Sequence, residues 1–495
     1  MVKINKVFGR VLSLVSMLMV MACSDQLEIE PEGILTEDQV FNSAGTTELA
    51  LGAVYYSYMT NSVGSAYMYG DVTTHNVEVS GLTDFTVINA EFAEDDAFVS
   101  GVWSGLYATI NLANNLINKV QEIGTYEEEI ENQHIAEAKF LRANCYFNLL
   151  KFYGDGALTG EMNGMGVPIQ LDEYDGTGIG EFIPRNTNGE VYDQIILDLT
   201  ESIPHLPSSY GDLLSTASRA TSGSAYALLA RAYLYARAYE SAAESANQVI
   251  IGMNYELEAD LRTLFPTTPI SAGNGGDRSF TSEDIFNLPI GANNSLSFAT
   301  STNQGKNNVF YDFTNSRWVS TDLIGSFGIL DNRKQQLIVE GWTGNTLDEG
   351  FDEFGNQLTT NLMTYKFGPR SEENVPNIRL AEVILTRAEA LARVNGLNQE
   401  SVDLLNQTYQ RANPLEIPME LADFSNADAL INRILLERRM ELMFENHERY
   451  DLIRTGRKDQ LANPDLPDNK LVMPIPQLEV DLSRGIIQQN SGYSY

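Results

Sequence analysis

The chain has 495 residues, of which 43% are hydrophobic and 20% charged, a composition typical of a folded globular protein. Its formal net charge of −35 at pH 7 repels phosphates and anionic lipid head groups. The charge therefore argues against a nucleic-acid partner and favours a neutral or cationic ligand, or another protein.

The first 22 residues have the features of a signal peptide. Three basic residues precede an apolar run, Val11–Ala22, that is too short to span a bilayer as a helix. The run ends at Cys23, and the sequence around it resembles the lipobox of bacterial lipoproteins. We expect cleavage before Cys23 and lipid attachment to its thiol; an ordinary secretory signal is the alternative. Residues 23–35 form an acidic tether.

Residues 36–254 are predicted to form an N-terminal helical region. Thr36 begins a capping box, and Ile135–Phe152 has a strong helical period. Residues 61–100 mix Gly, Ser, Thr and Asn with aromatic residues, which favours loops and short strands. In Thr221–Ile251, small and aromatic residues recur at the spacing of a tetratricopeptide helix pair.

The helical period fades over residues 255–375, where Pro, Gly, Asn, Ser and Thr become frequent. A long loop-rich insertion of this kind in a helical protein is usually functional. Residues 376–495 are helical again and include a second helix pair, Ala381–Asn395 and Gln399–Arg411. The predicted fold is mainly α, with tetratricopeptide-type helix pairs forming a scaffold in one compact unit, and the insertion carrying the ligand surface.

No motif for catalysis, a metal or a cofactor stands out. The chain contains neither a phosphate-binding Walker loop nor a Gly-x-Ser-x-Gly elbow, and its four histidines are widely separated. The acidic runs do not fit an EF-hand loop, although an irregular Ca²⁺ site stays open. A pair of catalytic carboxylates cannot be singled out among 67 acidic residues. We expect a binding protein rather than an enzyme, with no cofactor and no metal.

Several motifs together resemble the SusD/RagB family of outer-membrane nutrient-binding lipoproteins. The strongest is LERRMELMFENHERYDLIRTGR at residues 436–457, and the closing motif is MPIPQLE followed by QNSGY. The segments AEAKFLRA to FYGD, SRAT through AYALLARAYL, and RLAEVILTRAEAL occur in the family's order. The resemblance implies a lid on a SusC-like TonB-dependent transporter. Such a lid captures an oligosaccharide or a peptide at the extracellular face of the outer membrane and makes or breaks no bond.

The residues of these motifs are predicted to stabilise the helical scaffold. Arg438 falls on the apolar face of a helix predicted over Ile431–Arg454, so its guanidinium must be buried and paired with an acid. Glu445 and Arg449 are predicted to pair across one helical turn. The ligand residues are then expected elsewhere.

Candidate ligand residues lie in the two loop regions, since aromatic faces bind sugar rings and polar side chains take the hydroxyls. The alternative for each aromatic ring is to fill local core, to which we assign Trp103. The candidates are Tyr67, Tyr69, Asp71 and His75 in the first region, and Tyr311, Asn315, Trp318 and Trp342 in the second. A neutral glycan is favoured as the ligand. A peptide- or protein-binding lipoprotein is the alternative function, and a secreted glycosidase is a distant third.

Overall fold

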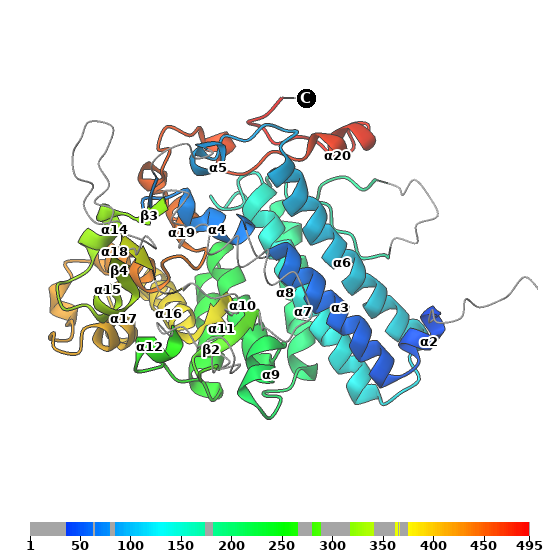
Figure 1. Ribbon diagram of the computed structural model, residues 1–495, viewed down its shortest axis with the longest axis horizontal. Coiled ribbons are helices and arrows are strands. Elements are labelled where there is room, and N and C mark those ends of the chain that lie inside the picture. Colours follow the sequence, from blue (N-terminus) through cyan, green and yellow to red (C-terminus); the bar gives the residue numbers. More distant parts are fainter. Residues whose placement is uncertain are drawn as a thin grey trace, which may run out of the picture.

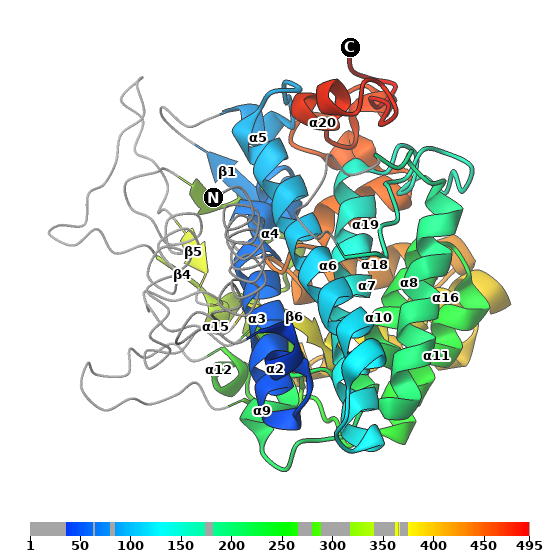
Figure 2. The same ribbon diagram turned by 90° about the vertical axis from the view of Figure 1, so that its right-hand side faces the viewer.

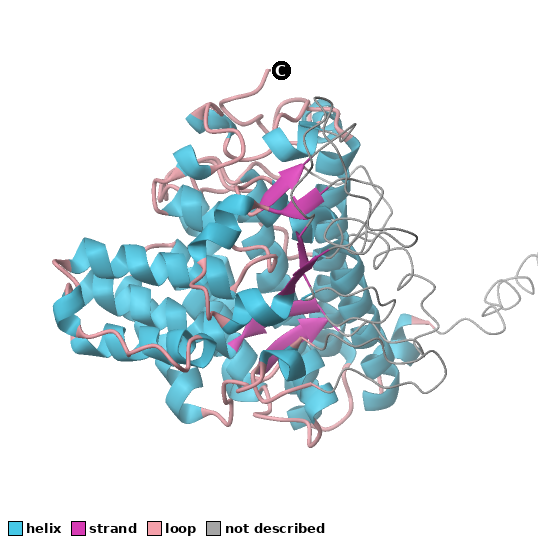
Figure 3. Ribbon diagram, turned by 60° about the vertical axis from the view of Figure 1, so that its left-hand side comes forward, coloured by secondary structure: helices cyan, strands magenta, loops and turns pink. Residues whose placement is uncertain are grey.

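The computed structural model describes residues 36–62, 65–79, 85–173, 182–265, 280–288, 317–340, 362–364, 366 and 375–494. Helices form most of this part of the molecule, and the short strands lie one above another with helices on both sides of them in the view of Figure 3. No helix within these ranges has the length and apolar character needed to cross a membrane. The predicted mainly α fold is confirmed.

The N-terminal half is a bundle of long helices, with α6 and α7 packed against each other and flanked by α3 and α8 (Figure 1). Thr36 forms the predicted capping box with Gln39. Trp103 and Cys145 are buried in this bundle, as expected. The bundle helices are α2 (Glu37–Phe41), α3 (Ala44–Ser62), α6 (Ala97–Ile123), α7 (Glu128–Tyr153) and α8 (Asn188–Ser202).

Two helix pairs continue the scaffold and adopt the predicted tetratricopeptide arrangement. The first is α10 (Ser222–Tyr235) with α11 (Tyr239–Gly252), and the second is α16 (Leu380–Asn395) with α17 (Gln399–Ala412). Ala242 and Ala246 are fully buried, because their small side chains let neighbouring helices approach closely. Since α11 also packs on α16, the two pairs form one continuous core although 127 residues of sequence separate them.

The C-terminal region closes the molecule with α18 (Ala427–Glu441), α19 (Glu448–Arg454) and α20 (Gln477–Leu482). Helix α20 and the C-terminus lie at one end of the long helices (Figure 2). Short helices connect these parts: α4 (Ser65–Val72), α5 (Phe85–Asn89), α9 (Leu213–Ser218), α12 (Leu261–Leu264), α14 (Thr321–Ser326), α15 (Asn332–Leu337), and the 3₁₀ turns Ile203–His205, Leu421–Asp423, Lys458–Gln460 and Asp468–Lys470.

The described strands form three antiparallel pairs. They are β1 (Val77–Val79) with β3 (Arg317–Val319), β2 (Asp284–Leu288) with β6 (Val375–Arg379), and β4 (Ile338–Glu340) with β5 (Leu362–Thr364). Loops and short strands were the expectation for residues 61–100. This was wrong for residues 85–89, which form α5, for residues 97–100, which begin α6, and for residues 65–72. Residues 65–72 form helix α4, which buries Tyr67 and Tyr69. Tertiary packing of the two rings stabilises a helix that the local sequence does not favour.

The prediction for Arg438 is confirmed. Its side chain is 1% exposed, its Nε donates to Asp451 Oδ2 over 2.9 Å, and its Nη1 donates to Thr386 Oγ1 over 3.1 Å. The predicted pair of Glu445 and Arg449 is wrong, because the helix breaks between α18 and α19. The Glu445 carboxylate instead accepts hydrogen bonds from Lys366 and Arg379.

Candidate ligand-binding surface

The two loop regions predicted to carry the ligand residues meet in space. Strand β1 from the first region pairs with β3 from the second, and Glu78 lies directly opposite Trp318. Figure 1 shows β3 beside α14 and α18. The ladder thus brings the chain around His75 next to the chain around Trp318, although about 240 residues separate them.

Side-chain bonds extend the contact beyond the three paired positions. The N–H of Ser320 donates to the carbonyl of Asn76 over 3.0 Å, and its hydroxyl donates to the carbonyl of His75. Both the N–H and the hydroxyl of Thr321 donate to Glu78 Oε1, over 2.7 and 2.6 Å. The start of α14 is therefore fixed to β1.

Arg439 on α18 completes this junction. Its Nε donates to Asn76 Oδ1 over 2.8 Å, and its Nη2 donates to the carbonyl of His75 over 3.1 Å and to Asp322 Oδ2 over 2.6 Å. The helix that carries the family-like motif thus holds both candidate segments at once.

The surface of this junction offers polar groups to solvent. The side chains of His75 and Glu78 are exposed, and the Asp322 side chain is 62% exposed. The two carboxylates can accept hydrogen bonds from the hydroxyls of a sugar, and the imidazole can accept or donate one. We define these three residues, with the ladder β1–β3, as the junction surface.

Three candidates lie elsewhere, in the interior. Tyr67 is 4% exposed, and its hydroxyl donates to the carbonyl of Pro376 over 2.8 Å. Tyr69 is 2% exposed and lies among Phe92, Phe98 and Phe152. Burial raises the pKa of both tyrosines. Neither ring offers a face to a ligand, so these aromatics fill core and we do not propose them as ligand contacts.

Asp71 is fully buried and also turns inward. Its carboxylate accepts from the amide of Asn76 and from the backbone N–H groups of Phe444 and Asn446. Burial raises the pKa of Asp71 to about 6, against the lowering effect of these bonds. Its position makes it a structural residue, not a ligand contact.

The remaining candidates cannot be placed by their side chains. Tyr311, Asn315 and Trp342 lie outside the described residues, as does the side chain of Trp318, whose backbone forms part of β3. Of the eight candidates, the junction surface therefore includes the side chain of His75 and the backbone of Trp318.

Glu78, Asp322 and Arg439 were missed in the sequence. Glu78 and Asp322 were ordinary acids among many, and only the pairing of β1 with β3 brings them together. Arg439 stands next to Arg438 in the motif, but a helix turns by 100° per residue, so the two side chains point to different neighbours. Within the described ranges, no group of three His, Cys, Asp or Glu side chains could hold a metal ion.

Two family models match the chain. The model described as "Starch-binding associating with outer membrane" matches residues 27–234, and the model described as "SusD family" matches residues 294–493. A SusD-like protein of Formosa agariphila is 24% identical over 518 residues, covering 97% of this chain and 98% of its own length.

Solved structures show the same fold. A SusD superfamily protein of Bacteroides vulgatus superposes with a TM-score of 0.74 at 23% identity, covering 92% of this chain and 100% of its own. Another from Bacteroides thetaiotaomicron has a TM-score of 0.71 at 24% identity, covering 90% and 99%. The two models match both halves of the sequence, and the relatives match nearly its whole length: the chain belongs to the SusD/RagB family of nutrient-binding proteins associated with the outer membrane.

Proposed function

We propose that this protein is a lipoprotein of the cell surface that captures a neutral oligosaccharide and acts as a lid on a TonB-dependent transporter. Cys23, at the end of the signal-like segment, is the proposed site of lipid attachment. The tether of residues 23–35 leads from it to α2. Under this proposal the helical body lies at the extracellular face of the outer membrane.

One observation carries the ligand part of the proposal. The ladder β1–β3 joins two distant segments into the junction surface, where His75, Glu78 and Asp322 can bond to hydroxyl groups. A neutral glycan supplies such hydroxyls, whereas a sulfated or uronic glycan would be repelled by the two carboxylates and by the net charge of −35. The description of the matching N-terminal family model, which names starch, supports a carbohydrate.

Isothermal titration calorimetry with the purified protein tests which class of ligand binds. The probes are neutral oligosaccharides, beginning with maltoheptaose, then charged ones such as oligogalacturonate, and finally a mixture of short peptides. We expect a neutral oligosaccharide to bind, with its chain length unchanged afterwards. Binding of peptides alone would favour the alternative of a peptide-binding lipoprotein, and the appearance of new reducing ends would show an enzyme.

Two exposed histidines provide a matched pair for locating the site. His75 lies at the junction surface, and His205 ends the 3₁₀ turn Ile203–His205, which packs against α7, α8 and α10. We expect His75→Ala to weaken oligosaccharide binding about tenfold, the effect of losing one good hydrogen bond. His205→Ala should leave the affinity unchanged. Equal effects of the two substitutions would place the ligand elsewhere.

The anchor and the partner require experiments in cells. Cys23→Ser should abolish labelling by radioactive palmitate and release the protein from the membrane fraction, whereas the buried Cys145 provides a control whose replacement leaves labelling intact. Affinity purification from detergent-solubilised membranes should recover a TonB-dependent transporter. Persistent labelling of the Cys23→Ser variant would contradict lipid attachment at this residue.

A further inference from the structure

The β1–β3 ladder is too short to fix its own register. Each strand has three residues, and an isolated pair of short strands is marginally stable in water. A shift by one residue would move the side chain of Val319, which is buried, to the opposite face of the ladder. The contacts at the ends of the ladder must therefore decide which face each side chain occupies.

Arg439, which lies on α18, contacts the segment before β1 and the segment after β3. The planar guanidinium bonds to Asn76 and the His75 carbonyl just before β1, and to Asp322 in the first turn of α14, just after β3. Its side chain is only 13% exposed, so these bonds are partly shielded from water. The Glu448 carboxyl also lies near, 3.6 Å from the Arg439 Nε.

The helix that carries Arg439 is itself rigidly held. Its neighbour Arg438 is buried against Asp451, and Glu437 accepts from Arg333 Nη1 over 2.6 Å. The guanidinium of Arg439 therefore projects from a fixed support toward two segments that the hydrogen bonds of Ser320 and Thr321 also join. A lysine could not replace it fully, because an ammonium lacks the planar fork that serves three acceptors in two directions.

We propose that Arg439 is a positioning residue of the ligand-binding surface, which holds β1 and the start of α14 in one register and so sets which side chains the junction surface presents. The proposal rests on the proposed function for its ligand, but the register that Arg439 maintains is a property of the free protein. The two can be measured separately.

The test compares Arg439→Ala and Arg439→Lys with Arg433→Ala. Arg433 lies on the same helix and pairs with Glu437 one turn away, so its loss is a matched control. Hydrogen exchange followed by mass spectrometry reports the register through peptides covering residues 73–79 and 317–322. Isothermal titration with maltoheptaose, and with any other neutral oligosaccharide that binds the unaltered chain, reports the ligand surface.

We expect Arg439→Ala to accelerate exchange in both peptides, leave α10 and α16 protected, and weaken oligosaccharide binding by about tenfold or more, as for the loss of a charge-assisted hydrogen bond. Arg439→Lys should give an intermediate result, and Arg433→Ala should match the unaltered protein. Unchanged exchange in the two peptides would overturn the proposal, as would faster exchange with full affinity.

Two outcomes keep this proposal apart from the proposed function. If the unaltered chain binds no oligosaccharide, the proposed ligand is wrong, while the exchange data still decide whether Arg439 fixes the register. If Arg439→Ala fails to fold, Asp322→Ala removes a single exposed partner of the same guanidinium and should accelerate exchange in residues 317–322. Normal exchange there would count against the role of Arg439.

Discussion

Asp71 accepts the backbone N–H of Asn446 over 2.9 Å, although 375 residues separate the two along the chain. The same carboxylate accepts the N–H of Phe444 over 2.9 Å. Phe444 and Asn446 both have positive φ, 66° and 68°, a backbone conformation that residues other than glycine rarely adopt. Asp71 therefore stabilises an unfavourable turn between α18 and α19 and attaches α4 to the C-terminal motif.

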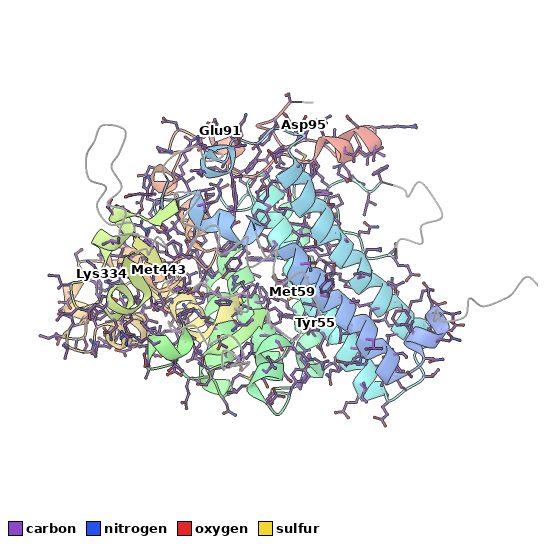
Figure 4. The ribbon with its side chains drawn as sticks, in the orientation of Figure 1. Tyr55, Met59, Glu91, Asp95, Lys334 and Met443 are labelled. Atoms are coloured by element: carbon purple, nitrogen blue, oxygen red, sulfur yellow. The ribbon has the colours of Figure 1, made fainter. Side chains whose placement is uncertain are left out.

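Replacing Asp71 with alanine should destabilise the protein strongly. The change leaves the N–H groups of Phe444 and Asn446 without this acceptor in the interior, and we expect a loss of about 3 kcal/mol or more in the free energy of unfolding. Urea denaturation measures it. Asp95→Ala is the control, since Asp95 is exposed and lies, like Glu91, at the upper edge of the molecule in Figure 4, and its change should stay within about 0.5 kcal/mol. Similar losses in both variants would contradict the role of Asp71.

Gly70 makes a second contact at the same turn. A Cβ added to Gly70 would lie 2.8 Å from both the Cα and the carbonyl carbon of Asn446, closer than real contacts allow. We expect Gly70→Ala to lower the denaturation midpoint and to cost about 2 kcal/mol or more, because backbone cannot move aside easily. In contrast, Gly101→Ala on α6 meets nothing within 4 Å and should stabilise the helix by about 0.5–1 kcal/mol. A tolerated Gly70→Ala would mean that the turn can shift.

The sequence allowed the scaffold to be predicted because its signals are local. Small and aromatic residues at helical spacing indicated the pair α10–α11, and the position of Arg438 among apolar neighbours required a buried ion pair. These features depend on residues a few positions apart, and the structure confirms them.

The candidate site could be predicted only in part because its geometry depends on distant residues. The break between α18 and α19 rests on Asp71, so no local pattern announced that Glu445 and Arg449 would separate. The burial of Tyr67 and Tyr69 likewise follows from packing of α4 against other segments. Their polar surroundings in the sequence were typical of a loop, and only tertiary contacts place them inside.

Glu448 should make stability depend on pH. Burial raises the pKa of Glu448 to about 8, and the charged groups around it are Arg439, Asp451, Asp71 and Arg457. The folded protein then keeps this proton at pH values where the unfolded chain, with an ordinary value of 4.5, has lost it. Stability contributed by this group must therefore fall as the pH rises between these values, by up to about 1.4 kcal/mol per pH unit.

Glu448→Gln tests this dependence, because glutamine keeps the shape of the neutral acid without its proton. Thermal unfolding from pH 5 to pH 9 should show a smaller decline for this variant than for the unaltered protein. Glu244→Gln, at an exposed position of α11, should leave the decline unchanged. Parallel curves for the Glu448→Gln variant and the unaltered protein would show that Glu448 is ionised throughout the range.

Asp451 should have the opposite dependence on pH. Its carboxylate accepts from Arg438 and from Arg454, and these guanidinium groups outweigh burial and lower the pKa of Asp451 to about 2. Because the folded value lies below the ordinary 3.8, the stabilisation is present above about pH 4 and is lost as the pH falls toward 2.

Asp451→Asn should therefore cost about 3–5 kcal/mol at pH 7, since it leaves two buried arginines short of a counter-charge. The penalty relative to the unaltered protein should shrink in acid, where the aspartate itself becomes neutral. Urea denaturation at pH 7 and at pH 3 measures both effects, with Asp481→Asn on the exposed side of α20 as the control. A penalty that stays constant between the two pH values would show that shape and hydrogen bonding, rather than charge, make Asp451 necessary at this position.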